Sequence, residues 1–116
     1  MESYLGIDIG GTNVVFGVVN DRSEFKYQSS LKTKNIESAE ELADTIFKEL
    51  KEKYKGSISG IGIGAPSVNC QTQKIEFAPN LQKWGDIIPL KQIFEDRFKT
   101  EVILVNDANA SAIGEK

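Results

Sequence analysis

The chain has 116 residues, the length of one ordinary domain, and its 40% hydrophobic and 27% charged residues are typical of a soluble globular protein, not of a disordered or fibrous one. A net charge of −3 argues against a basic surface for nucleic acid or an anionic membrane. With one cysteine and no histidine, the chain has no internal disulfide, Ser-His-Asp triad or histidine metal site. It has neither an apolar run of about 20 residues nor an apolar leader, so we expect a cytoplasmic protein without a membrane span.

The first third of the chain predicts three antiparallel strands. Apolar and small or polar residues alternate from Tyr4 to Ile9, which is the period of a strand. A β-branched run follows from Val14 to Val19 and predicts a largely buried second strand. A third strand is predicted over Phe25 to Leu31, and turn-forming residues separate the three. The chain therefore opens as a meander.

The period then changes to that of a helix. Apolar residues recur every three to four positions from Ser38 to Tyr54. Ser38 followed by Glu41 is typical of a capping box at a helix start. Gly56 is expected to end the helix.

The second half predicts alternating strands and helices. A strand is expected over Ile58 to Gly64, followed by a long irregular segment over residues 65–88. A helix is predicted from Pro89 to Phe98 and a short strand from Val102 to Val105. A third helix is expected from Ala110 onward.

The predicted order is βββαβαβα. A meander followed by alternating helices and strands predicts an α/β fold with a mixed five-stranded sheet, one half of it parallel, and helices on its faces. The third helix has barely begun when the chain stops at Lys116. We therefore expect residues 1–116 to be a single lobe and a fragment of a larger protein.

A first candidate site lies in the turn after the first strand. Gly10 and Gly11 have no side chain to keep a phosphate from the backbone N–H groups, and Thr12 and Asn13 can add side-chain hydrogen bonds. Asp8, at the end of the strand, is placed to act on Mg²⁺, directly or through water. The same residues also fit a plain β-hairpin with a glycine-rich turn. No Gly-Lys-Ser/Thr follows, so this is not a P-loop of the Walker type.

A second glycine-rich stretch, Gly60 to Ala65, formally fits the dinucleotide-binding pattern. That interpretation is rejected, because these glycines lie inside a strand and Pro66 follows where a helix should begin. Gly64 and Ala65 either allow a ligand close to the backbone at the strand end or serve close packing against the sheet.

The third candidate site lies at the end of the last strand. Asp107 is placed to act as a general base, with Asn106 orienting the attacking hydroxyl. The alternative is that Asp107 only caps the helix that follows.

Four segments together resemble the N-terminal domain of ROK-family sugar kinases of the bacterial glucokinase type. They read GIDIGGTNVVFGVV, GIGIGAPS, APNLQKW and VNDANASAIGE, and occur in order between Leu5 and Lys116. The resemblance implies the actin/hexokinase/Hsp70 type of fold with an RNase-H-like first lobe, which agrees with the element order read from the sequence. It also implies an enzyme that transfers the γ-phosphate of ATP to a sugar hydroxyl.

The resemblance implies roles for individual residues. Asp107 resembles the base that deprotonates the sugar, and the sugar pocket would include Gly64, Ala65, Asn80 and Asn106. The ATP phosphates would lie on the first turn, with Asp8 near the Mg²⁺; that turn comprises Gly10, Gly11, Thr12 and Asn13. Ser67 stands where many members have glycine and Gln82 where many have proline, so the sugar stays open among glucose, N-acetylmannosamine, N-acetylglucosamine, fructose and allose.

The expected partners are a sugar and ATP with Mg²⁺, with no nucleic acid and no membrane. A structural zinc, the adenine pocket and most of a homodimer interface would belong to a C-terminal lobe. Two other functions are considered: a sugar-binding transcriptional regulator of the same family and an inactive sugar-binding lobe. The regulator is disfavoured, because Met1 lies directly ahead of the first predicted strand and leaves no room for a DNA-binding domain.

Overall fold

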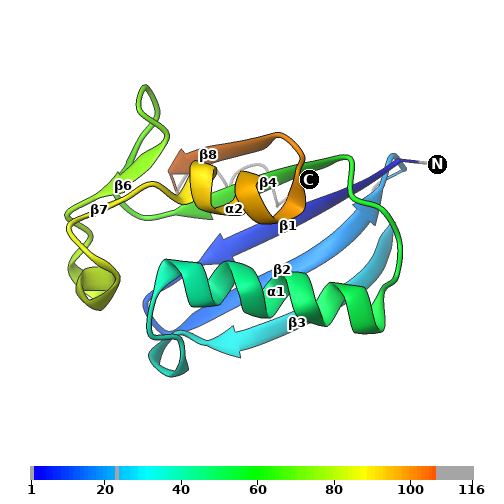
Figure 1. The fold of residues 1–116 in the computed structure, drawn as a ribbon, viewed down its shortest axis with the longest axis horizontal. Coiled ribbons are helices and arrows are strands. Elements are labelled where there is room, and N and C mark those ends of the chain that lie inside the picture. The colour runs from blue at the N-terminus through cyan, green and yellow to red at the C-terminus, as the bar shows by residue number, and fades with distance from the viewer. Residues whose placement is uncertain (1, 23, 107–116) are drawn as a thin grey trace.

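The computed structural model describes residues 2–22 and 24–106, and its centre is a five-stranded mixed sheet in the order β3-β2-β1-β4-β8 (Figure 1). The first three strands are antiparallel, whereas β1, β4 and β8 run parallel. This confirms the predicted meander and the parallel half. The strands are β1 (Ser3–Ile9), β2 (Asn13–Asn20), β3 (Phe25–Lys32), β4 (Gly60–Ala65) and β8 (Val102–Asn106).

Alternation along the strands divides the sheet into two faces. Leu5 and Ile7 in β1 and Ile63 in β4 point to the buried face, while Gly6 points to the other. The second strand is largely buried, as predicted, although Val15 is 40% exposed on that second face. A β-branched run favours a strand but does not tell how many of its faces are covered.

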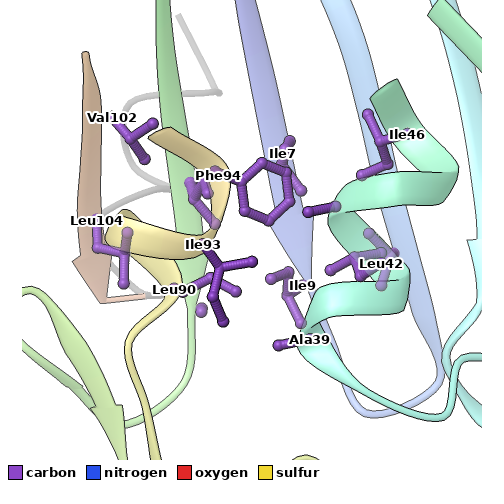
Figure 2. Close-up of a cluster of buried hydrophobic side chains, with 14 of the residues drawn as sticks. Ile7, Ile9, Ala39, Leu42, Ile46, Leu90, Ile93, Phe94, Val102 and Leu104 are labelled. Atoms are coloured by element: carbon purple, nitrogen blue, oxygen red, sulfur yellow. The ribbon is translucent and has the colours of Figure 1, made fainter. Parts of the chain in front are cut away.

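Two helices cover the buried face, α1 (Ala39–Lys53) and α2 (Leu90–Phe98), and both lie on the same side of the sheet (Figure 1). The Phe94 ring of α2 lies between the two helices and above Ile7 of β1 (Figure 2). Leu42 and Ile46 of α1 approach the same cluster, and all four side chains are almost inaccessible to solvent. This apolar layer fixes the helices against the sheet.

Helix α1 begins as predicted and ends differently. The Ser38 hydroxyl accepts a hydrogen bond from the Glu41 N–H at 3.0 Å, which is one half of the predicted capping box. The Glu41 carboxylate accepts from the Glu37 N–H at 3.0 Å and not from the Ser38 N–H. At the other end the left-handed residue is Lys55, with φ 62°, and not Gly56. A Cβ at Gly56 would lie 2.5 Å from the Tyr54 ring, so a side chain here would displace that ring.

The segment expected to be irregular contains secondary structure. A small antiparallel sheet in the order β5-β6-β7 lies here, together with one 3₁₀ helix, η2. Strands of two or three residues are too short to show a hydrophobic period, which is why the sequence did not predict them. The elements are β5 (Val68–Asn69), β6 (Lys74–Glu76), η2 (Pro79–Trp84) and β7 (Ile87–Ile88), and a second 3₁₀ helix, η1 (Thr33–Asn35), precedes α1.

Two further expectations concern the third helix and membrane spans. The helix predicted from Ala110 lies outside the described residues. Among residues 2–22 and 24–106, no helix has the length and apolar character needed to cross a membrane.

Candidate functional site

The parallel strands β1, β4 and β8 end at the same edge of the sheet. Asp8 of β1 is in register with Gly64 of β4, and Ala65 of β4 is in register with Asn106 of β8. The arrowheads of these three strands point to the end of the molecule where β6 and β7 lie (Figure 1). Four of the predicted site residues are thus adjacent across three strands, where open α/β sheets commonly bind ligands. Asp107 follows directly in sequence and lies outside the described residues.

The glycine turn joins β1 to β2 at this edge. It is closed by a hydrogen bond of 2.9 Å from the Gly10 N–H to the Asn13 carbonyl. Gly11, Thr12 and Asn13 are all exposed. Within the described part of the chain, no hydrogen bond engages the Thr12 hydroxyl or the Asn13 carboxamide. The turn therefore presents polar groups that can bind an anion.

Asn80, far away in the sequence, lies against this turn. A Cβ added at Gly11 would be 3.0 Å from the Asn80 Cβ and 3.1 Å from its Nδ2. Any side chain at Gly11 would therefore press on Asn80, because real Cβ contacts are rarely so close. The residues predicted for phosphate and for sugar thus touch each other, which spacing in the sequence does not reveal.

The Asn106 carboxamide makes two hydrogen bonds to the backbone of Val68. Its Oδ1 accepts from the Val68 N–H at 3.0 Å, and its Nδ2 donates to the Val68 carbonyl at 3.1 Å. A carboxamide has a second N–H and a second lone pair, so one of each remains for a ligand. Asn106 therefore fixes the strand after Ser67 to the end of β8, whether or not it also binds a sugar.

Two supporting residues were missed by the sequence reasoning. Gln73 pairs with the edge of β8: its Oε1 accepts from the Leu104 N–H at 2.6 Å and its Nε2 donates to the Leu104 carbonyl at 3.1 Å. Thr33 bonds the carbonyl of Gly10 in the glycine turn. Neither belongs to a recognisable pattern, because each lies in a short segment without a hydrophobic period.

The donor set suits a nucleotide phosphate with Mg²⁺. Mg²⁺ prefers one or two carboxylates together with phosphate oxygens and water. Asp8 provides an exposed carboxylate at the sheet edge, two residues before Gly10 of the glycine turn. The described residues contain no group of three or more His, Cys, Asp or Glu side chains arranged to hold a metal.

Trp84 is buried and also makes a hydrogen bond. Its ring is buried, and its indole N–H donates to the Ile36 carbonyl at 2.9 Å. It packs at the end of η2, the helix that carries Asn80. A buried indole with a satisfied N–H both fills space and fixes an orientation.

Known proteins resemble this chain over nearly its whole length. The glucokinase of Streptomyces coelicolor is 38% identical over 117 residues, covering 99% of this chain and 36% of that protein. The xylose repressor of Caldicellulosiruptor bescii is 32% identical over 121 residues, covering 98% of this chain and 30% of that protein. The chain thus spans about a third of the length of these relatives.

A solved structure gives the same result for the fold. The ROK family glucokinase from Streptomyces griseus, in complex with glucose and AMPPNP, matches with a TM-score of 0.79 at 34% identity, over 97% of this chain and 36% of that one. This likeness confirms the actin/hexokinase type of α/β fold expected from the sequence. The family model for the ROK family matches residues 4–116. The chain belongs to the ROK family.

Proposed function

We propose that this chain is the N-terminal lobe of an ATP-dependent hexose kinase of the glucokinase type. The observation that carries the proposal is the contact between the glycine turn and Asn80, where a Cβ at Gly11 would lie 3.0 Å from the Asn80 Cβ. Transfer of a phosphoryl group needs the donor phosphate and the acceptor hydroxyl side by side. The turn proposed to hold the phosphate contacts Asn80, which is proposed to bind the sugar, and this contact meets the requirement. The glucokinase relatives point to the same reaction.

The proposed roles are those that the family resemblance implies, and the positions of the described residues support them. The glycine turn holds phosphate oxygens on its exposed polar groups, and Asp8 acts on the accompanying Mg²⁺, which neutralises phosphate charge when bound. Gly64, Ala65, Asn80 and Asn106 are the residues proposed for the sugar side. Asn80 is exposed and Asn106 half-buried, whereas Gly64 and Ala65 are buried behind them at the end of β4. Asp107 takes the proton from the attacking sugar hydroxyl.

The test is sugar phosphorylation by the full-length protein that carries this chain. The wild type is assayed with MgATP and glucose, N-acetylmannosamine, N-acetylglucosamine, fructose and allose, with ADP release as the readout. Asp107→Asn should keep sugar binding by calorimetry and lose roughly 10²–10⁴-fold in kcat, because the base is removed while the shape is kept. Asp21→Asn, in the exposed turn between β2 and β3, is the matched control and should leave kcat unchanged. An unchanged kcat in Asp107→Asn would refute the role of the base.

A sugar-binding regulator is the second candidate, since the xylose repressor relative matches 98% of this chain. The two functions share a sugar site and differ in the event that sugar binding leads to, which is phosphoryl transfer in one and a change in DNA affinity in the other. If no sugar in the panel is phosphorylated, but a sugar binds and changes the affinity of the full-length protein for DNA, the regulator is the correct function. If a sugar is phosphorylated, the kinase proposal stands.

A further inference from the structure

A buried threonine, Thr33, is hydrogen-bonded to the backbone of the glycine turn. Thr33, the first residue of η1, is 2% exposed. Its hydroxyl donates to the Gly10 carbonyl at 2.8 Å, and its N–H donates to the Thr12 carbonyl at 3.0 Å. These two bonds grip the turn on both sides of Gly11, so the backbone of the turn cannot shift without breaking one of them.

The same short helix supports the segment that carries Asn80. The Trp84 indole, at the end of η2, donates to the Ile36 carbonyl at 2.9 Å, and this bond is buried. The Lys83 ammonium donates to the Lys34 carbonyl at 2.8 Å. A bond of 3.1 Å from the Ile36 N–H to the Thr33 carbonyl closes η1 itself. Residues 33–36 are thus bonded to the glycine turn on one side and to η2 on the other.

The contact between Gly11 and Asn80 closes a ring of direct contacts among the glycine turn, η1 and η2. It runs from the turn to η1 through Thr33, from η1 to η2 through Trp84, and back from Asn80 to the turn. Each link is a hydrogen bond of ordinary length or a van der Waals contact. The distance between the two halves of the site is therefore fixed by η1 as well as by the sheet.

We propose that Thr33 is a positioning residue for phosphoryl transfer and that residues 33–36 are the shared support of the phosphate turn and the sugar segment. This proposal rests on the kinase function proposed above. The proposal predicts different effects for the loss of the Thr33 and Trp84 hydrogen bonds. Loss of the Thr33 hydroxyl frees the turn and weakens the nucleotide steps, whereas loss of the Trp84 N–H frees η2 and weakens the sugar steps.

The kinetic test uses the full-length protein and conservative pairs. Thr33→Val keeps the shape and removes the hydroxyl, and should raise KM for ATP about 3–10-fold, the value of one hydrogen bond, with a smaller change in KM for the sugar. Thr33→Ser restores the hydroxyl and should restore KM. Trp84→Phe should raise KM for the sugar more than KM for ATP. A role confined to stability would move both KM values alike or neither, and either result would overturn the proposal.

A second measurement on the 116-residue chain needs no activity. The Gly10 amide donates to Asn13 inside the turn, while the Ser59 amide donates to Ser3 at 2.7 Å at the other end of the sheet. Thr33→Val should speed hydrogen exchange of the Gly10 amide more than that of Ser59, and Thr33→Ser should not. Equal acceleration of both amides overturns the proposal. If the wild type phosphorylates no sugar, the kinase function fails, and the exchange result still decides the role of Thr33 in holding the turn.

Discussion

Ser67 has a backbone φ of 57°, in the left-handed region that glycine enters most easily. The sequence already singled this position out, because many members of the family have glycine where this chain has Ser67. The structure supplies the reason: the chain turns sharply between β4 and β5, and the turn needs a left-handed residue. The serine carries a steric cost of about 1–2 kcal/mol there.

Replacing Ser67 with glycine should therefore cost no stability, in contrast to the same change at an ordinary strand position. Ser67→Gly relieves the left-handed strain, which offsets the roughly 0.5–1 kcal/mol that glycine's extra chain entropy costs. Ser30→Gly, in the exposed part of β3, has no strain to relieve and should lose that amount. Urea unfolding of the two variants measures the difference. An equal loss of unfolding free energy in the two variants would show that Ser67 is not strained.

At the scale of elements, an ion pair within α2 is hydrogen-bonded to the edge strand β8. The Lys91 ammonium lies 2.7 Å from Glu95 and donates to the Val102 carbonyl at 2.5 Å. The Val102 N–H in turn donates to Glu95 at 3.3 Å. The hydrogen bond from Lys91 lowers the pKa of the Glu95 carboxyl, partial burial opposes it, and the Val102 N–H lowers it further. The carboxylate form thus stabilises the register of β8, and with it the position of Asn106.

This ion pair predicts a pH dependence of stability. Because the folded pKa of Glu95 lies below its ordinary value of 4.5, its contribution is fully present above that value and is lost as the pH falls through the folded pKa. Glu95→Gln should lower the free energy of unfolding by at most about 1 kcal/mol at pH 7, since the pair is partly solvated. The gap to the wild type should close below pH 4.5. Asp96→Asn, at an exposed neighbour, is the control, and a gap that persists at low pH would rule out the carboxylate as its cause.

At the scale of the whole molecule, the described residues supply one side of the candidate site, on which Gly11, Thr12 and Asn13 are exposed. The described strand ends and the glycine turn form one wall, and the chain spans 36% of the length of the Streptomyces coelicolor glucokinase. Phosphoryl transfer to a sugar must exclude water, or the nucleotide is hydrolysed instead. Exclusion of water requires a second wall that closes over the substrates.

The 116-residue chain by itself should therefore not phosphorylate sugars. We expect no glucose-dependent ADP release from MgATP in a coupled assay of the purified chain, while the full-length protein turns over under the same conditions. Turnover by the chain alone would show that one lobe is enough for sugar phosphorylation and would contradict this prediction.

Local patterns predicted most of the framework. Alternation in β1, the β-branched run of β2 and the 3.6-residue stripe of α1 each reflect which side of an element is buried, and burial is recorded in consecutive residues. The capping by Ser38 was predictable for the same reason, because its partner Glu41 is three residues away. The glycine turn and the last residues of β4 and β8, among them Gly64 and Asn106, were marked by residue types that such places require.

Tertiary structure alone decided how these pieces meet. The contact of Gly11 with Asn80, the pairing of Asn106 with Val68 and the grip of Thr33 on Gly10 all join residues distant in sequence. Such contacts are selected by the packing of whole elements, so no single window of sequence carries them. The sequence by itself determined the strands of the central sheet, its two helices, the family and the candidate residues. It did not determine the short strands β5, β6 and β7 or the two 3₁₀ helices. The arrangement that would make the candidate residues a site depends on how the sheet edge, η1 and η2 pack together, because hydrogen bonds between separate segments form only once the chain is folded.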